Sequence, residues 1–553
     1  MYQYDGYDQA IVDQRVSDFR DQTARFLAGQ LSDQEYQPLR LQNGLYIQRY
    51  APMLRIAVPY GMLSSRQLRS LAAITRDFDR GYAHVSTRQN LQINWPELER
   101  VPDILAELAK VEMHAIQTSG NCIRNITTDQ FAGVAKGESL DPRPYCEILR
   151  QWSTLHPEFA FLPRKFKIAV SANQTDRAVI LAHDIGIELD TDSSHGVTAS
   201  VYVGGGLGRT PMIGSLLKER LPIQQLISYL EATLRVYNQF GRRDNKYKAR
   251  IKILVKAMGI SAFADKVEAQ WAVTQQSPTD ITAAEIERVS QFFSEPNYLD
   301  PQRIDSESLP AAMARNRLFA RWVTNNTAEH RRPGYRIVTV ALKSAGQAPG
   351  DVTHQQLDAL ALLADQFSFG EVRTTHQQNI VLADVQEDEL AALWHRLQEY
   401  QLAAPTAGTL HDMICCPGGD FCSLANAKSI PIANAIQDRF DDLDYVCDLG
   451  PIELNISGCM NACGHHHVGH IGILGVDKKG REFYQIALGG RQGKEAAIGK
   501  ILGPSFSQEA IADVVETILN TYVTHRIEPE TFIDTYDRIG IETFKEAVYA
   551  SAH

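Results

Sequence analysis

Four cysteines in the C-terminal part of the chain have a spacing that suits metal chemistry. Cys416 and Cys422 enclose five residues, and Cys459 and Cys463 enclose three. Four thiolates from two loops are the ligands that a [4Fe–4S] cluster requires. A structural zinc site usually takes its thiolates as two narrow pairs, and the first pair here is too wide. The spacing predicts an iron–sulfur cluster, with a zinc site or unliganded core cysteines as alternatives; Cys415 adjoins this set but does not fit its spacing.

Two lysines in the first half could bind an anion. Residues 162–170 are predicted to form a strand, and side chains alternate along a strand. Lys165 and Lys167 therefore share one face, while Phe166 and Ile168 share the other. An ordinary surface strand would look the same, and a single Lys or Arg is far more often a solvated charge than a ligand.

Other cations have equally suggestive positions. Arg88 is predicted on the polar face of a strand, and Arg124 follows the turn at residues 119–121. The densest basic stretch is Arg242, Arg243, Lys246, Lys248, Arg250, Lys252 and Lys256. This stretch is either a solvated helix face or a cradle for a polyanion, and composition alone does not separate the two interpretations.

The elements that must position these residues occur twice in the chain. Two segments share the order strand, helix, strand, with apolar alternation in the strands and helical spacing of Leu and Ala between them. The predicted elements are residues 54–58, 67–72 and 86–91 in the first segment and residues 335–340, 356–361 and 375–380 in the second. A larger lobe follows each, which indicates duplication; chance similarity of two α/β modules is the alternative. Polar linkers are predicted at residues 275–282 and 306–309.

Composition limits the possible classes of protein. The chain has 553 residues, 44% of them hydrophobic and 22% charged, which is typical of a globular protein with several lobes. A net charge of −11 disfavours a nucleic-acid binder. No apolar run approaches ~18 residues, so no membrane span is predicted. With no basic and apolar leader at the start, eight cysteines are expected to stay reduced in the cytoplasm.

Together these residues resemble the sirohaem-containing sulfite and nitrite reductases. The cysteine pattern resembles the cluster signature of that family, and Arg88, Arg124, Lys165 and Lys167 resemble its substrate-binding residues. The resemblance runs from about Gly44 to the C-terminal region. It implies an α+β fold in which two ferredoxin-like half-domains and two larger α/β domains are related by a pseudo-twofold axis.

The resemblance also implies domain boundaries and cofactor contacts. The expected domains are an N-terminal extension (1–43), a first half-domain (44–115), a sirohaem and substrate-binding domain (116–325), a second half-domain (326–405) and a cluster and sirohaem-binding domain (406–553). Cys463 would be shared by the cluster and the sirohaem iron. The other residues expected at the sirohaem are Arg250, Lys252, Gln378, Asn379 and Arg491.

The function implied is the six-electron reduction of sulfite to sulfide, as in sulfate assimilation. The alternative in the same architecture is a nitrite reductase that makes ammonia; its members commonly have asparagine at the position of Lys167, so lysine there favours sulfite. An iron–sulfur electron carrier or a degenerate paralogue is a further, non-catalytic alternative. No strand–G-x-G-x-x-G–helix unit predicts a nicotinamide site, so a separate ferredoxin or flavoprotein is expected to supply electrons. The run His465–His467 does not predict a metal site, because adjacent residues do not converge on one ion.

Overall fold

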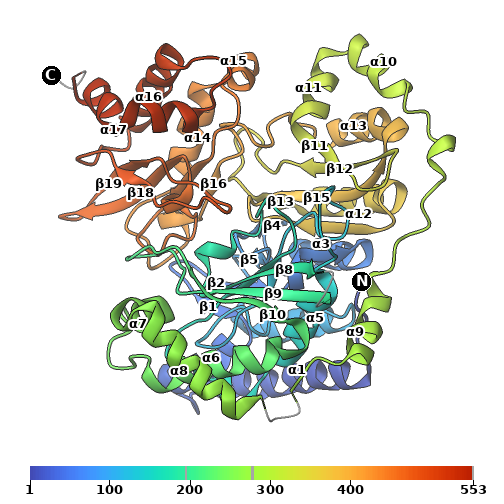
Figure 1. Cartoon of the computed structure of the whole chain (residues 1–553), viewed down its shortest axis with the longest axis vertical. Coiled ribbons are helices and arrows are strands. Elements are labelled where there is room, and N and C mark those ends of the chain that lie inside the picture. Colours follow the sequence, from blue (N-terminus) through green and yellow to red (C-terminus); the bar gives the residue numbers. More distant parts are fainter. Residues whose placement is uncertain (193–195, 276–278, 551–553) are drawn as a thin grey trace.

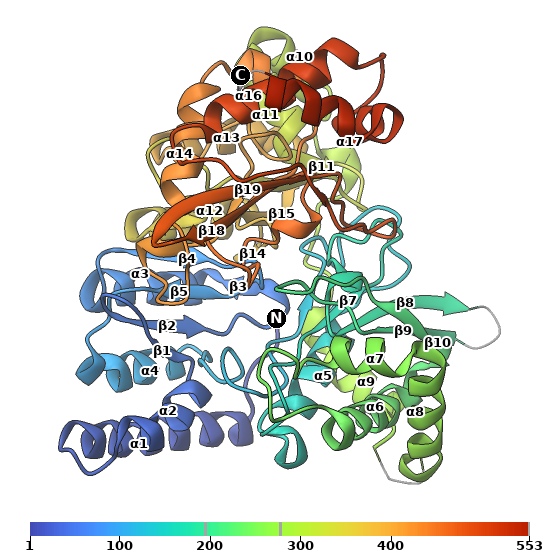
Figure 2. The same cartoon turned by 90° about the vertical axis from the view of Figure 1, so that its left-hand side faces the viewer.

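The computed structural model describes residues 1–192, 196–275 and 279–550. Within these ranges the strands form four five-stranded sheets, with helices packed against them (Figure 1, Figure 2). The four sheets form two pairs, and the two sheets of each pair have matching topology. The sheets of the two half-domains are called the small sheets below, and those of the two larger domains are called the large sheets. The predicted duplicated α+β fold is therefore confirmed. No helix in the described ranges combines the length and the apolar character needed to cross a bilayer.

The first small sheet follows two N-terminal helices, α1 (Gly6–Leu27) and α2 (Asp33–Gln42). Its strand order is β1-β2-β5-β4-β13. The strands are β1 (Leu45–Ile47), β2 (Pro52–Ile56), β5 (Leu91–Ile93), β4 (Tyr82–Val85) and β13 (Asp351–Thr353), and the helices are α3 (Ser65–Phe78) and α4 (Val101–Ala109). Helix α1 packs on α4, so the N-terminal segment adds a layer beneath this half-domain (Figure 2).

The second small sheet repeats the arrangement in the order β11-β12-β15-β14-β3. Its strands are β11 (Thr327–Glu329), β12 (Tyr335–Val340), β15 (Ile380–Gln386), β14 (Glu371–Thr374) and β3 (Met62–Ser64). Its helices are α10 (Ser308–Arg315), α11 (Arg317–Asn326), α12 (His354–Phe367) and α13 (Leu390–Glu399).

The two half-domains exchange their edge strands. Strand β13 lies in the second half of the chain but pairs with β4, and β3 lies in the first half but pairs with β14. Helices α3 and α12 follow these exchanged strands and pack on each other. Leu68 and Leu357, one from each helix, are fully buried in the same hydrophobic cluster. The exchange therefore joins the two half-domains through one core.

The repeated sequence also gives the two helices the same start. Ser64 and Thr353 accept hydrogen bonds from the backbone of Gln67 and Gln356, each at 3.2 Å, and both glutamine side chains accept from the cap backbone in return. This reciprocal capping box satisfies backbone donors that a helix start otherwise leaves free.

The two large sheets share one topology of parallel and antiparallel pairs. One has the order β10-β9-β8-β7-β6 and the other β20-β19-β18-β17-β16. The first contains β6 (Thr127–Thr128), β7 (Ile168–Ser171), β8 (Ile185–Asp192), β9 (Gly196–Val203) and β10 (Ser215–Pro222), with α5 (Arg143–Ser153), α6 (Leu226–Phe240), α7 (Ile251–Met258), α8 (Ile260–Thr274) and α9 (Ala283–Ser290). The second contains β16 (Ile414–Cys415), β17 (Leu454–Ser457), β18 (Ile471–Lys478), β19 (Arg481–Leu488) and β20 (Lys500–Ile501), with α14 (Ile430–Arg439), α15 (Leu443–Asp448), α16 (Ile511–His525) and α17 (Phe532–Ala550).

The structure corrects part of the strand and linker predictions. Residues 86–90 and 375–379 are turns rather than strands, closed by hydrogen bonds from Ser86 N to Asn90 O (2.8 Å) and from Thr375 N to Asn379 O (3.0 Å). A few alternating residues fit a strand or a turn equally well, so the pattern was not sufficient. Of the first predicted linker, residues 276–278 lie outside the described residues; the second ends in the first turn of α10.

Candidate active site

Arg88 is held inside the molecule by the turn between β4 and β5. Gln89, the next residue, has a positive φ of 57°, which closes the turn. Arg88 is 9% exposed, and its guanidinium donates to Asn125 O at 2.6 Å and to Thr127 Oγ1 at 2.7 Å. Arg88 therefore links the first half-domain to the start of the first large sheet.

Arg124 is fixed by backbone carbonyls. Its guanidinium donates to Thr118 O at 2.8 Å and to Gly120 O at 2.8 and 3.1 Å. These acceptors carry no net charge, so the positive charge of Arg124 is oriented but not neutralised.

Lys165 and Lys167 lie just before β7, which begins one residue later than the second lysine. Phe166 and Ile168 are fully buried and the two lysines are not, so the predicted alternation of faces is confirmed. Lys167 N donates to Asp184 Oδ2 at 2.9 Å, which fixes the backbone here.

Two residues of the basic stretch turn inward and bind other parts of the protein. Arg250 makes a two-pronged ion pair with Asp184, at 2.8 and 2.7 Å. Lys252 is 4% exposed and donates to three carbonyl oxygens, those of Gly206 (2.9 Å), Leu207 (2.8 Å) and Thr210 (2.6 Å). Glycine is required in this loop, because a Cβ on Gly205 would meet Leu181 O at 2.3 Å.

The cations of this region disfavour one another's charged forms. Burial lowers the pKa of Arg88 to about 9 and the pKa values of Lys165 and Lys252 to about 8. The pKa of Lys167 falls well below its usual value, through burial and then through Lys165 and Arg88. Clustered cations in a water-poor site are stabilised when an anion binds among them. This arrangement favours the binding of an anion.

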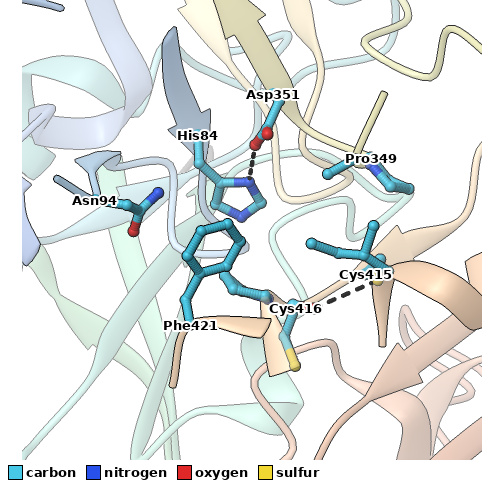
Figure 3. Close-up of a pocket in the computed structure, with 10 residues that line it drawn as sticks. His84, Asn94, Pro349, Asp351, Cys415, Cys416 and Phe421 are labelled. Atoms are coloured by element: carbon cyan, nitrogen blue, oxygen red, sulfur yellow. Dashed lines mark hydrogen bonds and ion pairs between the residues drawn. The ribbon is translucent and has the colours of Figure 1, made fainter. Parts of the chain in front are cut away.

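Cys416 rather than Cys415 has the environment of a cluster ligand. The Cys416 sulfur accepts a hydrogen bond from Gly458 N at 3.2 Å and lies 3.6 Å from Ser429 Oγ. Cys415 is 1% exposed and belongs to the hydrophobic core of the C-terminal domain. Figure 3 shows that the Cys416 sulfur points away from Cys415 and from the pair His84–Asp351. The hollow drawn there has a volume of about 10 Å³, which is room for one water molecule.

The other three predicted ligands lie around Cys463. Burial raises the pKa of Cys416 to about 12 and that of Cys459 to about 11, and it also raises the pKa of Cys422; a charged Cys463 adds to each shift. Among the described residues, no group of three or more His, Cys, Asp or Glu is tight enough for a single metal ion.

Three residues with predicted cofactor roles have their polar groups engaged elsewhere. Gln378 donates to Val85 O and Cys415 O, both at 3.0 Å. Asn379 donates to Asp412, and Arg491 pairs with Asp537 on α17 at 2.7 Å. The structure does not bring these three side chains among the cations described above, and their cofactor contacts stay predictions.

Sequence reasoning missed several residues that shape the site. Asp184 anchors both Arg250 and the backbone of Lys167, and Thr87 Oγ1 donates to Cys463 O at 2.8 Å, which ties the Arg88 turn to the cysteine loop. Burial by itself raises the pKa of Tyr46, but nearby cations, Arg55 first, lower it to about 8. Of these residues, only Thr87 could have been suspected from the sequence, because it stands beside Arg88.

Buried imidazoles complete the region and bear on whether cofactors fit it. His376 Nε2 and His465 Nδ1 have no hydrogen-bond partner among the described residues. Burial lowers the pKa of His376 to about 4, and that of His465 falls well below its usual value for the same main reason. An unpartnered imidazole nitrogen on His465, a cluster of cations and the Gly458 N–H on Cys416 are features that an anionic macrocycle and a thiolate-bound cluster would satisfy. The residues present therefore fit both groups.

Comparison with known families gives the same picture. The sequence model described as "Nitrite and sulphite reductase 4Fe-4S domain" matches residues 119–274 and 407–553. The model of the "Nitrite/Sulfite reductase ferredoxin-like half domain" matches residues 47–111 and 330–400. Both occur twice, once in each half of the duplicated fold.

Individual relatives extend over most of the chain. "Sulfite reductase [ferredoxin] 1" of Mycolicibacterium paratuberculosis is 28% identical over 492 residues, which is 87% of this chain and 81% of the relative. The chloroplastic "Ferredoxin--nitrite reductase" of Arabidopsis thaliana is 27% identical over 486 residues, 84% and 75% of the two chains. The solved structure of Mycobacterium tuberculosis NirA has a TM-score of 0.76 and 26% identity, and the match covers 93% of this chain and 92% of that one.

Proposed function

Since this chain is an oxidoreductase that belongs to the nitrite and sulfite reductase family, we propose that it reduces sulfite to sulfide at a sirohaem joined to a [4Fe–4S] cluster through Cys463. One observation carries the proposal. The half-buried cations Lys165 and Lys167 are close enough to Cys463 for its charge to oppose the lowering of both lysine pKa values. This influence supports assigning the two lysines and the predicted shared ligand to one site.

The cations would hold the substrate through its oxygens. Arg124 is oriented by neutral carbonyls and keeps its charge for an anion. Arg88 is fixed by its bonds to Asn125 and Thr127 and would complete the charged wall. Preorganised donors of this kind stabilise negative charge that develops as S–O bonds break.

The two lysines are suited to deliver protons. Reduction of sulfite consumes six electrons and six protons and releases each oxygen as water. A bound anion favours the charged form of Lys167, so the side chain would take up a proton as the substrate enters. The lowered pKa of Lys165, about 8, makes its proton easier to release than that of an ordinary lysine.

Cofactor binding would fall to residues around this pocket. When bound, the cluster and the sirohaem supply one-electron chemistry that no side chain here provides. Cys416, Cys422, Cys459 and Cys463 would hold the cluster. Arg250 and Lys252 would face the carboxylates of the macrocycle, and Asp184 would keep Arg250 in position.

The electron donor is a separate protein in this proposal. The curated relatives are named for ferredoxin, and we propose a ferredoxin as donor here as well, with a flavoprotein as the alternative. Nitrite is the second candidate substrate, because nitrite reductases also occur among the relatives. Lys167 favours sulfite, since it adds a charge and a proton donor that the larger anion requires.

Two measurements test the proposal. The visible spectrum of the purified protein should contain sirohaem bands, which neither zinc nor a lone cluster gives. Turnover should then be measured with sulfite and with nitrite, using one chemical one-electron donor at one pH. If protein that has been supplied with iron and sirohaem shows no sirohaem bands, the proposed reaction is refuted. A higher kcat/KM for nitrite than for sulfite would reassign the substrate.

A further inference from the structure

A second cavity lies beside the turn of the second half-domain. It has a volume of about 300 Å³ and is lined by residues of β12, of the 375–379 turn and of the C-terminal domain. This cavity holds the same place in the second half of the molecule as the candidate active site holds in the first. The two halves can be matched residue by residue through their hydrogen bonds.

The turns provide the first match. Gln89 Oε1 accepts from Thr128 N at 3.1 Å, and Gln378 Oε1 accepts from Cys415 N at 2.8 Å. Both glutamines have a positive φ, 57° and 61°. Gln89 thus corresponds to Gln378, and Thr128 corresponds to Cys415.

The parallel strands provide the second match. Thr128 pairs with Val170, and Cys415 pairs with Ile456. Three residues before these partners stand Lys167 in the first half and Glu453 in the second. The backbone agrees, because Lys167 O accepts from Ile185 N at 3.1 Å and Glu453 O accepts from Ile471 N at 3.0 Å. Lys167 and Glu453 are therefore equivalent positions with opposite charge.

Two other cations of the active site, Arg88 and Lys165, have no charged counterpart. By the same register, Gln377 stands where Arg88 stands in the first half, and Pro451 stands where Lys165 stands. The ionisable side chains among the described residues that line the second cavity are two carboxylates, Asp412 and the glutamate just described. The cavity therefore repels the anions that the first site attracts.

One of the two carboxylates is left without a neighbouring cation. Lys343 Nζ lies 3.8 Å from Asp412 Oδ1 and donates to Gln377 O at 2.7 Å, so it balances Asp412. Glu453 Oε2 accepts from the neutral amide of Gln492 at 3.1 Å and forms no ion pair within the described residues. Glu453 is the charge that a ligand would neutralise.

Two amide oxygens in the wall also lack a donor. Asn326 is 1% exposed and Gln130 is 6% exposed, and both line the cavity. Asn326 Oδ1 and Gln130 Oε1 have no hydrogen-bond partner among the described residues. Both oxygen atoms have almost no accessible surface, so they are sealed from the cavity and cannot accept from a ligand there.

We infer that this cavity binds a small ammonium-type cation, either the ammonium ion or a small primary amine. A positive charge meets Glu453, which lies where the first half has a lysine. The volume is at the lower end of the range for small-molecule sites, roughly 300–1,000 Å³, which excludes a macrocycle. This site does not depend on the reaction proposed for the first site.

Isothermal titration calorimetry of the full-length protein tests this site. Ethylammonium chloride, ammonium chloride and potassium chloride are titrated at constant ionic strength into the wild type and into Glu453→Gln, Asp412→Asn and Glu495→Gln. We expect saturable binding of ethylammonium, ammonium or both, weakened about tenfold or more in Glu453→Gln. The exposed control Glu495→Gln should bind as the wild type does.

The comparison of cations and variants decides the outcome. Binding of ethylammonium without ammonium assigns the site to organic amines, and the reverse assigns it to the ion. No saturable binding of either would overturn the inference, as would equal binding of potassium or equal affinity of Glu453→Gln and the wild type. Because glutamine has nearly the shape of glutamate, circular dichroism should show that Glu453→Gln is folded. If it is not, Glu453→Asp, which keeps the charge but shortens the side chain, should bind more weakly than the wild type, and wild-type affinity there would overturn the inference.

Discussion

Arg177 donates two hydrogen bonds to the buried carboxylate of Asp129, at 2.9 and 2.6 Å. Because Thr128 corresponds to Cys415, the next residues, Asp129 and Cys416, also correspond. Ile185 and Ile471 are equivalent strand positions, and Arg177 precedes the first by the same number of residues as Cys463 precedes the second. Arg177 therefore corresponds to Cys463. An ion pair thus stands in the first half where the second half has two predicted cluster ligands.

This ion pair should support folding rather than the cluster. Removing one partner of a buried pair leaves an uncompensated charge, which costs about 3–5 kcal/mol. Asp129→Asn is expected to lower the free energy of unfolding in urea by about that amount, with iron content unchanged. The control Glu158→Gln breaks an exposed pair with Arg235 and should cost less than about 1 kcal/mol. Loss of iron from folded Asp129→Asn would contradict this assignment.

Iron content should separate the two adjacent cysteines. Cys416→Ser is expected to lose the cluster, because its sulfur faces Gly458 N, whereas Cys415 lies in the core. Cys415→Ser should retain both cofactors and lose only some stability. Metal analysis with the visible spectrum provides the measurement. The opposite pattern would shift the ligand assignment by one residue.

Lys165 should act on the substrate rather than on the fold, and no hydrogen bond to a described residue engages its side-chain nitrogen. Losing a charged hydrogen-bond partner costs about 1.5–3 kcal/mol, so Lys165→Ala should lose roughly tenfold to a hundredfold in sulfite kcat/KM with both cofactors retained. Arg88→Ala should lose at least as much turnover and some stability, because Arg88 also binds Asn125 and Thr127. The exposed Lys248→Ala is the control; wild-type turnover in Lys165→Ala would remove this lysine from the mechanism.

Substrate preference should depend on Lys167. Sulfite has one more oxygen than nitrite and more negative charge, so it gains more from a second lysine. Lys167→Asn keeps hydrogen bonding but removes the charge and a proton donor, and it should lower kcat/KM for sulfite much more than for nitrite. The ratio of the two constants, measured at one pH with one donor, should therefore fall. An unchanged ratio would show that Lys167 does not select the substrate.

Glu453 should make stability depend on pH. Burial raises the pKa of Glu453 from 4.5 to about 7, so between these values the folded chain binds more protons than the unfolded chain. The free energy of unfolding therefore falls as pH rises through this window, and the loss is complete above pH 7. Glu453→Gln cannot ionise, so its stability relative to the wild type should increase between pH 5 and pH 8 in urea unfolding. A constant difference would mean that the glutamate is not buried in solution; Glu495→Gln is the exposed control.

The sequence determined the chemistry because that chemistry depends on local spacing. The cysteine pattern and the order of Arg88, Arg124, Lys165 and Lys167 were enough to predict the family, which the comparisons confirm. The alternation of Lys165 with Phe166 was also correct, since burial along an extended chain follows a period of two. The duplication was visible because both copies keep the order strand, helix, strand with the same spacing of Leu and Ala in the helix.

Tertiary structure alone decided how distant segments meet. The exchange of β3 and β13, the contact of Thr87 with Cys463 and the anchoring of Arg250 by Asp184 join residues that no local pattern relates. The turn at Arg88 was misread because a backbone hydrogen bond and a positive φ, rather than polarity, define it. The charge inversion from Lys167 to Glu453 likewise became visible only when strand register aligned the two halves, because duplicated sequences that have diverged keep their backbone pairing longer than their side chains.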